Sequence, residues 1–180
     1  MTSSRLRLPL LLALIAAAAA AHAEVKSAAS DGFLLSYTKR VDAPPANVYA
    51  ALATIDRWWD GDHTYSGSAA NLSLQPQAGG CFCERWSDGS VEHGRVIMAI
   101  RDQTLRLQTA LGPLQGRAVT GVLTFQLKPD EKGTQLTMTY QVNGTSASAL
   151  DKSAPAVDGV LGTQFSRLTR LIETGKAAAQ

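Results

Sequence analysis

Residues 153–175, SAPAVDGVLGTQFSRLTRLIETG, contain the pattern that decides the fold. Their apolar residues recur at steps of three and four, the spacing of one face of an α-helix. Ser153 is a candidate N-cap, Pro155 suits a first helical turn, and Gly175 is a typical helix stop. We therefore predict one long amphipathic helix whose apolar stripe must cover another surface. The stripe is formed by Val157, Leu161, Phe165, Leu168 and Ile172.

The chain before this helix reads as a series of strands separated by turns. Apolar and polar residues alternate, which is the period of a half-buried strand. The apolar face is clearest at Leu105, Leu107, Leu123, Phe125, Leu127, Leu136, Met138 and Tyr140. One apolar sheet face and one helical stripe predict an α+β architecture, in which a curved antiparallel sheet wraps around the C-terminal helix and encloses an internal cavity. Strands are expected over 33–41, 72–74, 81–86, 91–100, 104–110, 121–128 and 135–142, and a short helix over 47–54.

The amino terminus has the order of a secretory signal peptide. Arg5 and Arg7 precede an apolar run over 8–21, and Ala21-His22-Ala23 is a small-x-small cleavage site. The run is shorter than the about 20 residues of a membrane span. We predict cleavage after Ala23 and a periplasmic or secreted protein. The predicted division is signal peptide 1–23, flexible lead-in 24–32, one domain 33–175 and loose tail 176–180.

Charge and composition exclude several classes of function. Removing Arg5 and Arg7 reduces the 17 basic residues to 15, equal to the 15 acidic ones. A neutral chain without a basic cluster lacks the footprint of a nucleic-acid binder. The sequence after residue 23 has no second long apolar run, so no membrane insertion is expected after cleavage. It has no Gly-rich phosphate loop either, and we expect no cofactor.

Several motifs carry a family resemblance. Residues 41–52, VDAPPANVYAAL, resemble the opening of the START-like superfamily (SRPBCC, Bet v 1-like). Trp58-Trp59, Gly79-Gly80 and Gly94-Arg95-Val96 resemble the branch related to the C-terminal domain of the Hsp90 ATPase activator. The resemblance spans residues 33–172 and implies a helix-grip fold with a largely apolar cavity. Because an exported chain meets neither cytosolic Hsp90 nor ATP, we expect no ATPase or true co-chaperone activity.

The leading functional hypothesis is binding of a small, largely apolar molecule in that cavity. The resemblance places the aromatic corner, residues 58–65, near the cavity mouth. Alternatively, the two tryptophans plug one end of the core and His63 bonds within its loop. An interaction domain for an exported partner is a further alternative. The candidate ligand-binding residues are Trp58, Trp59, His63, Tyr65, Cys83, Phe125, Met138, Tyr140 and Phe165.

Cys81 and Cys83 flank Phe82, so an extended strand points both thiols to one face. Their Cα atoms would lie roughly 6.6 Å apart, near the limit of a disulfide. The sequence leaves two interpretations open, a strained disulfide or two free thiols that pack as small apolar side chains. A third interpretation joins the two cysteines to His63 and His93 as a zinc or copper site.

Glu84, Glu92 and His93 lie on one predicted hairpin and could act as acid–base groups of a cyclase or dehydratase. Alternation puts Glu92 and His93 on opposite faces, so at most one points inward. Which face of the 81–86 strand is the inner one is open. In the alternative interpretation, these side chains form cross-strand pairs with Arg85 or Arg95 on the wet face.

Overall fold

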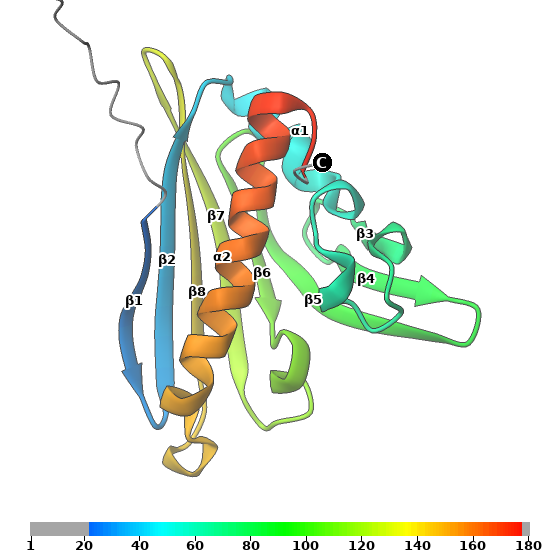
Figure 1. Ribbon diagram of the computed structural model, residues 1–180, viewed down its shortest axis with the longest axis vertical. Helices are drawn as coiled ribbons and strands as arrows, with labels where there is room; N and C mark the ends of the chain where they lie inside the picture. Colours follow the sequence, from blue (N-terminus) through cyan, green and yellow to red (C-terminus); the bar gives the residue numbers. More distant parts are fainter. Residues whose placement is uncertain (1–21, 178–180) are drawn as a thin grey trace, which may run out of the picture.

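The computed structural model describes residues 22–177 (Figure 1). Eight antiparallel strands form one sheet in the order β1-β2-β8-β7-β6-β5-β4-β3. The strands are β1 His22–Ala29, β2 Gly32–Val41, β3 Leu72–Leu74, β4 Cys81–Trp86, β5 Gly89–Ile100, β6 Thr104–Thr109, β7 Thr120–Asp130 and β8 Gly133–Asn143. The helices are α1 Pro45–Ala53 and α2 Leu150–Thr174, with short 3₁₀ turns η1 Ile55–Arg57, η2 Gly61–His63, η3 Ala69–Asn71, η4 Gly112–Leu114 and η5 Ser146–Ser148.

The sheet is covered in two parts. Helix α2 packs on β1, β2 and β8, and α1 contacts α2, β7 and β8. The strands β3, β4 and β5 extend away from α2 (Figure 1), and the segment with η1, η2 and η3 contacts β3 and β4 instead. This arrangement confirms the predicted α+β helix-grip fold, a curved antiparallel sheet with a long C-terminal helix.

The core lies where the predicted alternation placed it. On β7 and β8 the register pairs Leu123 with Tyr140 and Phe125 with Met138, and all four side chains are buried. Phe165 from α2 meets Tyr37 of β2 with ring centroids 5.7 Å apart. Burial of each such large apolar side chain contributes about 1.5–3 kcal/mol, so these cross-strand and helix–sheet contacts hold α2 on the sheet.

The predicted termini of the domain need correction. The segment 24–32, expected as a flexible lead-in, forms most of β1 and the turn into β2, paired from His22↔Thr38 to Ala29↔Gly32. Its backbone is held by β2 although its small residues show no alternation. In the predicted loose tail, Ala177 is buried against the core. Most of the predicted signal peptide, residues 1–21, and residues 178–180 lie outside the described residues.

Helix α2 begins earlier than its sequence signals indicate. Its first residue is Leu150, and Pro155 lies inside the helix rather than in the first turn. The Leu150 N–H donates to the Ser30 carbonyl (N–O 2.9 Å), so a long-range bond satisfies the helix start without a side-chain cap. Ser153, the predicted N-cap, instead accepts a hydrogen bond from the Arg117 guanidinium at 2.9 Å.

Candidate functional site

A β-bulge in β5 turns His93 toward the inner face of the sheet. Phe82 of β4 pairs with Gly94, but Cys83 pairs with Glu92, so His93 is the extra residue. His93 is consequently only 7% exposed, whereas Glu92 points outward. The prediction that at most one of the two faces inward is therefore confirmed.

Glu84, two residues after Phe82 on the same face of β4, is completely buried and bonded to His93. Its Oε2 lies 2.8 Å from His93 Nε2. The backbone N–H groups of Tyr65 and Ser66 donate to the two carboxylate oxygens at 3.1 and 2.5 Å. Burial raises the pKa of Glu84, but the bonds from Ser66, Tyr65 and His93 outweigh it and hold that pKa below its ordinary value. Glu84 is thus a buried carboxylate with three hydrogen-bond donors.

Two aromatic rings enclose the His93 imidazole. The Phe82 and Tyr65 ring centroids lie 4.8 and 5.8 Å from it, each inclined by 31°. Tyr65 is 52% exposed, and its phenol donates to the Gly112 carbonyl at 3.1 Å. Tyr65 therefore forms a half-exposed cover over His93, tied to the η4 turn by one hydrogen bond.

The aromatic corner is held on α2 by two polar side chains. Arg167 Nε donates to the Trp58 carbonyl at 2.8 Å, and Gln164 Oε1 accepts the Asp60 N–H at 2.8 Å. Trp58 packs against Phe125 with centroids 6.3 Å apart and against Trp59 at 5.6 Å. The tryptophans thus plug the core between α2 and β7.

Two buried N–H donors in this corner lack an acceptor. Trp58 Nε1 and Gln164 Nε2 are inaccessible to solvent and have no hydrogen-bond partner among residues 22–177. Leaving such a buried donor unpaired costs about 1–3 kcal/mol. The neighbouring Trp59 Nε1, in contrast, donates to the His63 carbonyl at 3.1 Å. Both unpaired donors belong to the contact between α2 and the aromatic corner, and each could donate to an acceptor oxygen.

Cys81 and Cys83 form a disulfide with Cα atoms 5.3 Å apart. The bulge in β5 lies opposite Cys83. The Cα atoms of Cys81 and Cys83 are closer together than those of residues i and i+2 in a regular strand. Phe82 and Glu84 occupy the inner face of β4, so alternation assigns both cysteines to the other face. The alternative metal set is wrong for the described residues, because the thiols are bonded to each other and no group of three metal-ligating side chains is found in 22–177.

The other candidate residues divide between surface and core. His63 is exposed, and Glu92 forms an exposed ion pair with Arg95 (N–O 2.8 Å) on the wet face, but within β5 and not across strands as the alternative interpretation predicted. That alternative is wrong for Glu84 and His93, which are buried and bonded to each other. The remaining predicted ligand-binding side chains are buried together in one hydrophobic cluster: Trp58, Trp59, Phe125, Met138, Tyr140 and Phe165. Burial raises the pKa of Tyr140 to about 12, and its hydroxyl accepts the Leu111 N–H.

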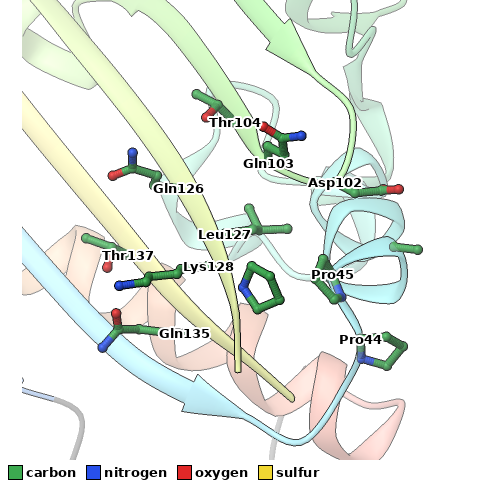
Figure 2. A pocket seen from close by; sticks show the side chains of 12 residues that line it. Pro44, Pro45, Asp102, Gln103, Thr104, Gln126, Leu127, Lys128, Gln135 and Thr137 are labelled. Carbon is green, nitrogen blue, oxygen red and sulfur yellow. The ribbon is translucent and has the colours of Figure 1, made fainter. Parts of the chain in front are cut away.

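Two hollows of about 700 and 420 Å³ lie beside the start of α1 and the end of β7. Figure 2 shows the larger one, between the start of α1 and polar side chains of β7 and β8. Neither is lined by a residue predicted for the site, so the internal cavity stays a prediction. The larger hollow is bordered by Pro44, Pro45, Asp102, Gln126, Lys128 and Gln135, among others.

Sequence reasoning missed Gln164, Arg167 and the backbone of Ser66. Gln164 could have been found, because it interrupts the apolar stripe between Leu161 and Phe165 with an amide. The role of the Ser66 backbone N–H cannot be predicted from the sequence, because every residue except proline has a backbone N–H. Its role depends only on where the corner loop meets Glu84.

The fold and its polar corner define a helix-grip protein with an acid–imidazole pair at one end of the sheet. In addition, the described residues contain no helix long and apolar enough to cross a membrane. Residues 42–173 match the family described as Activator of Hsp90 ATPase homolog 1-like protein. The chain belongs to this family.

Solved structures share the fold at low sequence identity. A protein of unknown function from Staphylococcus aureus is 16% identical, with a TM-score of 0.58 over 81% of this chain and 96% of its own. A protein from Mesorhizobium loti is 20% identical, with a TM-score of 0.53 over 77% and 95% of the two chains. Among curated proteins, none matches this sequence. These similarities concern the fold alone.

Proposed function

We propose that this is an exported protein that binds a small, largely apolar molecule between the sheet and α2. The fold of the family commonly binds ligands in a cavity. The proposed export rests on the order Arg5–Arg7, apolar run, Ala21-His22-Ala23. The ATPase activity named in the family description concerns a cytosolic chaperone, which an exported chain would not meet.

The observation that carries the proposal is the pair of unpaired donors, Trp58 Nε1 and Gln164 Nε2. A ligand oxygen between them would recover the hydrogen bonds that the buried indole and amide lack. The cation of this corner, the partly buried Arg167, is already bonded to the Trp58 carbonyl and lies 3.7 Å from the Asp60 carboxylate, and no lysine or arginine is fully buried in residues 25–177, which disfavours an anionic ligand. We therefore expect an uncharged ligand with a carbonyl, ether or hydroxyl oxygen and an apolar body.

Ligand entry requires the aromatic corner to move. The predicted lining side chains fill one continuous core, and the corner is fastened to α2 through Arg167 and Gln164. Movement of the Trp58–Trp59 segment away from α2 would open a path without breaking any strand pairing. Binding is therefore expected to be slow relative to diffusion and to change tryptophan fluorescence.

The test compares two neighbouring Trp→Phe variants. Native mass spectrometry of the exported wild type should show a bound small molecule, identified after solvent extraction. Trp58→Phe removes the unpaired donor together with part of the buried indole ring and should lower ligand occupancy at least tenfold. Trp59→Phe is the control, because its donor is already paired with His63. A wild type that carries no ligand and binds no uncharged apolar fluorescent probe, or equal occupancy in both variants, refutes the proposal.

A further inference from the structure

Packing of the β4–β5 hairpin does not by itself require a buried, hydrogen-bonded Glu84–His93 pair. Among residues 25–177, Glu84 is the only carboxylate with a fully buried side chain, and it is bonded to a nearly buried imidazole. Burying a charge is costly unless it is paired. Perturbed, buried pairs of titratable groups concentrate at functional sites.

The hydrogen bonds around Glu84 determine which imidazole nitrogen can accept a proton. An ionised carboxylate only accepts hydrogen bonds, so the 2.8 Å contact requires the proton to be on His93 Nε2. The lone pair of the neutral ring is then on Nδ1. Nδ1 has no hydrogen-bond partner among the described residues, and His93 retains slight solvent exposure. His93 is therefore oriented as a base through Nδ1.

A fixed carboxylate and two aromatic rings surround the imidazole. The Glu84 carboxylate is fixed by the Tyr65 and Ser66 N–H groups and lies against Nε2. The faces of Phe82 and Tyr65, at 4.8 and 5.8 Å, favour a cation between them. The other nearby charges, Glu92 and Arg95, neutralise each other on the outer face.

The inward orientation of His93 depends on the bulge in β5, which interrupts the regular pairing with β4. Regular alternation from Val96 would place Gly94 and Glu92 on the inner face and His93 outside. Because β5 has one extra residue, His93 occupies the inward-facing position that Glu92 would have in a regular strand. Bulges are known to re-aim side chains next to active sites.

We propose that His93 is a general base that removes a proton at Nδ1 from an uncharged, weakly acidic substrate, with Glu84 as its positioning residue. Suitable substrates have a phenolic O–H or a C–H next to a carbonyl. The O–H or C–H bond breaks, an N–H bond forms at Nδ1, and the electron pair stays on the substrate as phenolate or enolate. Return of the proton to another substrate atom completes an isomerisation without an oxidant. Tyr65, held by one bond to Gly112, is the side chain that must move to admit the substrate.

The first test is nitrogen NMR of the wild-type imidazole between about pH 5 and 8, the range in which histidine changes charge. Neutral His93 should carry its proton on Nε2, and Glu84→Gln should give a mixture of tautomers. A permanently charged ring, or a proton on Nδ1 in the neutral ring, overturns the proposal. The wild-type measurement does not depend on any variant folding.

The second test uses a nitrophenol, whose phenolate has its own absorbance band. At a pH where the free probe is mostly protonated, wild-type protein should increase the phenolate signal. His93→Gln should abolish the increase, Glu84→Gln should reduce it at least tenfold, and the exposed-histidine control His63→Gln should leave it unchanged. An equal signal in wild type and His93→Gln overturns the proposal. Trp58→Phe should not alter the His93 tautomer, which separates this inference from the proposed ligand site.

Discussion

Replacing Glu84 by glutamine tests the energetics of the buried pair directly. The substitution preserves shape but turns one acceptor oxygen into an N–H₂ group that faces His93 or a backbone N–H. A hydrogen bond to a buried charged group contributes about 1.5–3 kcal/mol, and a buried donor left without an acceptor costs about 1–3 kcal/mol. Glutamine keeps one oxygen, which accepts either the Ser66 N–H or both the Tyr65 N–H and His93 Nε2, so at least one donor loses its acceptor and we expect a loss of about 3 kcal/mol. This is a large share of the about 5–15 kcal/mol that stabilises a domain.

Glu92→Gln is the matched control in the adjacent strand. Glu92 and its partner Arg95 are 47% and 54% exposed, so solvent screens their ion pair. Its loss should cost about 0–1 kcal/mol. Urea unfolding followed by tryptophan fluorescence gives both free energies of unfolding. If the free energy of unfolding lost in Glu84→Gln is within about 1 kcal/mol of that lost in Glu92→Gln, the buried pair contributes no more than a surface pair, contrary to the expectation.

The same variant should change the response to acid. The pKa of Glu84 is lowered in the folded protein from its ordinary value of 4.5. Its carboxylate therefore stabilises the fold fully above that ordinary value, and this stability is lost as the pH falls through the lower folded-state pKa. The free energy of unfolding of Glu84→Gln should fall less steeply below pH 4.5 than that of the wild type. Parallel acid curves would contradict the assigned direction of the shift.

The remaining predictions concern the disulfide, the sheet and processing. Reducing the Cys81–Cys83 disulfide should cost at most about 1.6 kcal/mol, because the closed loop is very short; a larger loss of stability in urea unfolding contradicts this. Gly121→Ala should destabilise by about 1–3 kcal/mol, because its Cβ would collide with the Thr109 carbonyl oxygen and lie 2.9 Å from the Tyr140 ring; an unchanged unfolding midpoint contradicts the close approach. Mass spectrometry of the exported protein should find the amino terminus directly after Ala23, and an intact residue 1 would exclude the predicted cleavage.

Local patterns were sufficient for most of the fold. The alternation through Leu123, Phe125 and Leu127 predicted β7 and its inner face, because successive side chains of a strand always point to opposite sides. The stripe ending at Leu168 and Ile172 predicted α2, although not its first turns. Strand β1 was missed because its pairing with β2, rather than its own composition, makes it a strand.

For the site, the sequence determined which residue types were available, and only the tertiary structure decided which of them meet. Glu84, Glu92 and His93 were all candidates, but regular alternation could not reveal that an extra residue in β5 turns His93 onto Glu84. A bulge depends on the register of two strands, and register is fixed by contacts between segments distant in sequence. Gln164 likewise acquires its partner and its unpaired donor only when the corner loop meets α2. The chemistry was present in the sequence, and the geometry that combines it came from long-range packing.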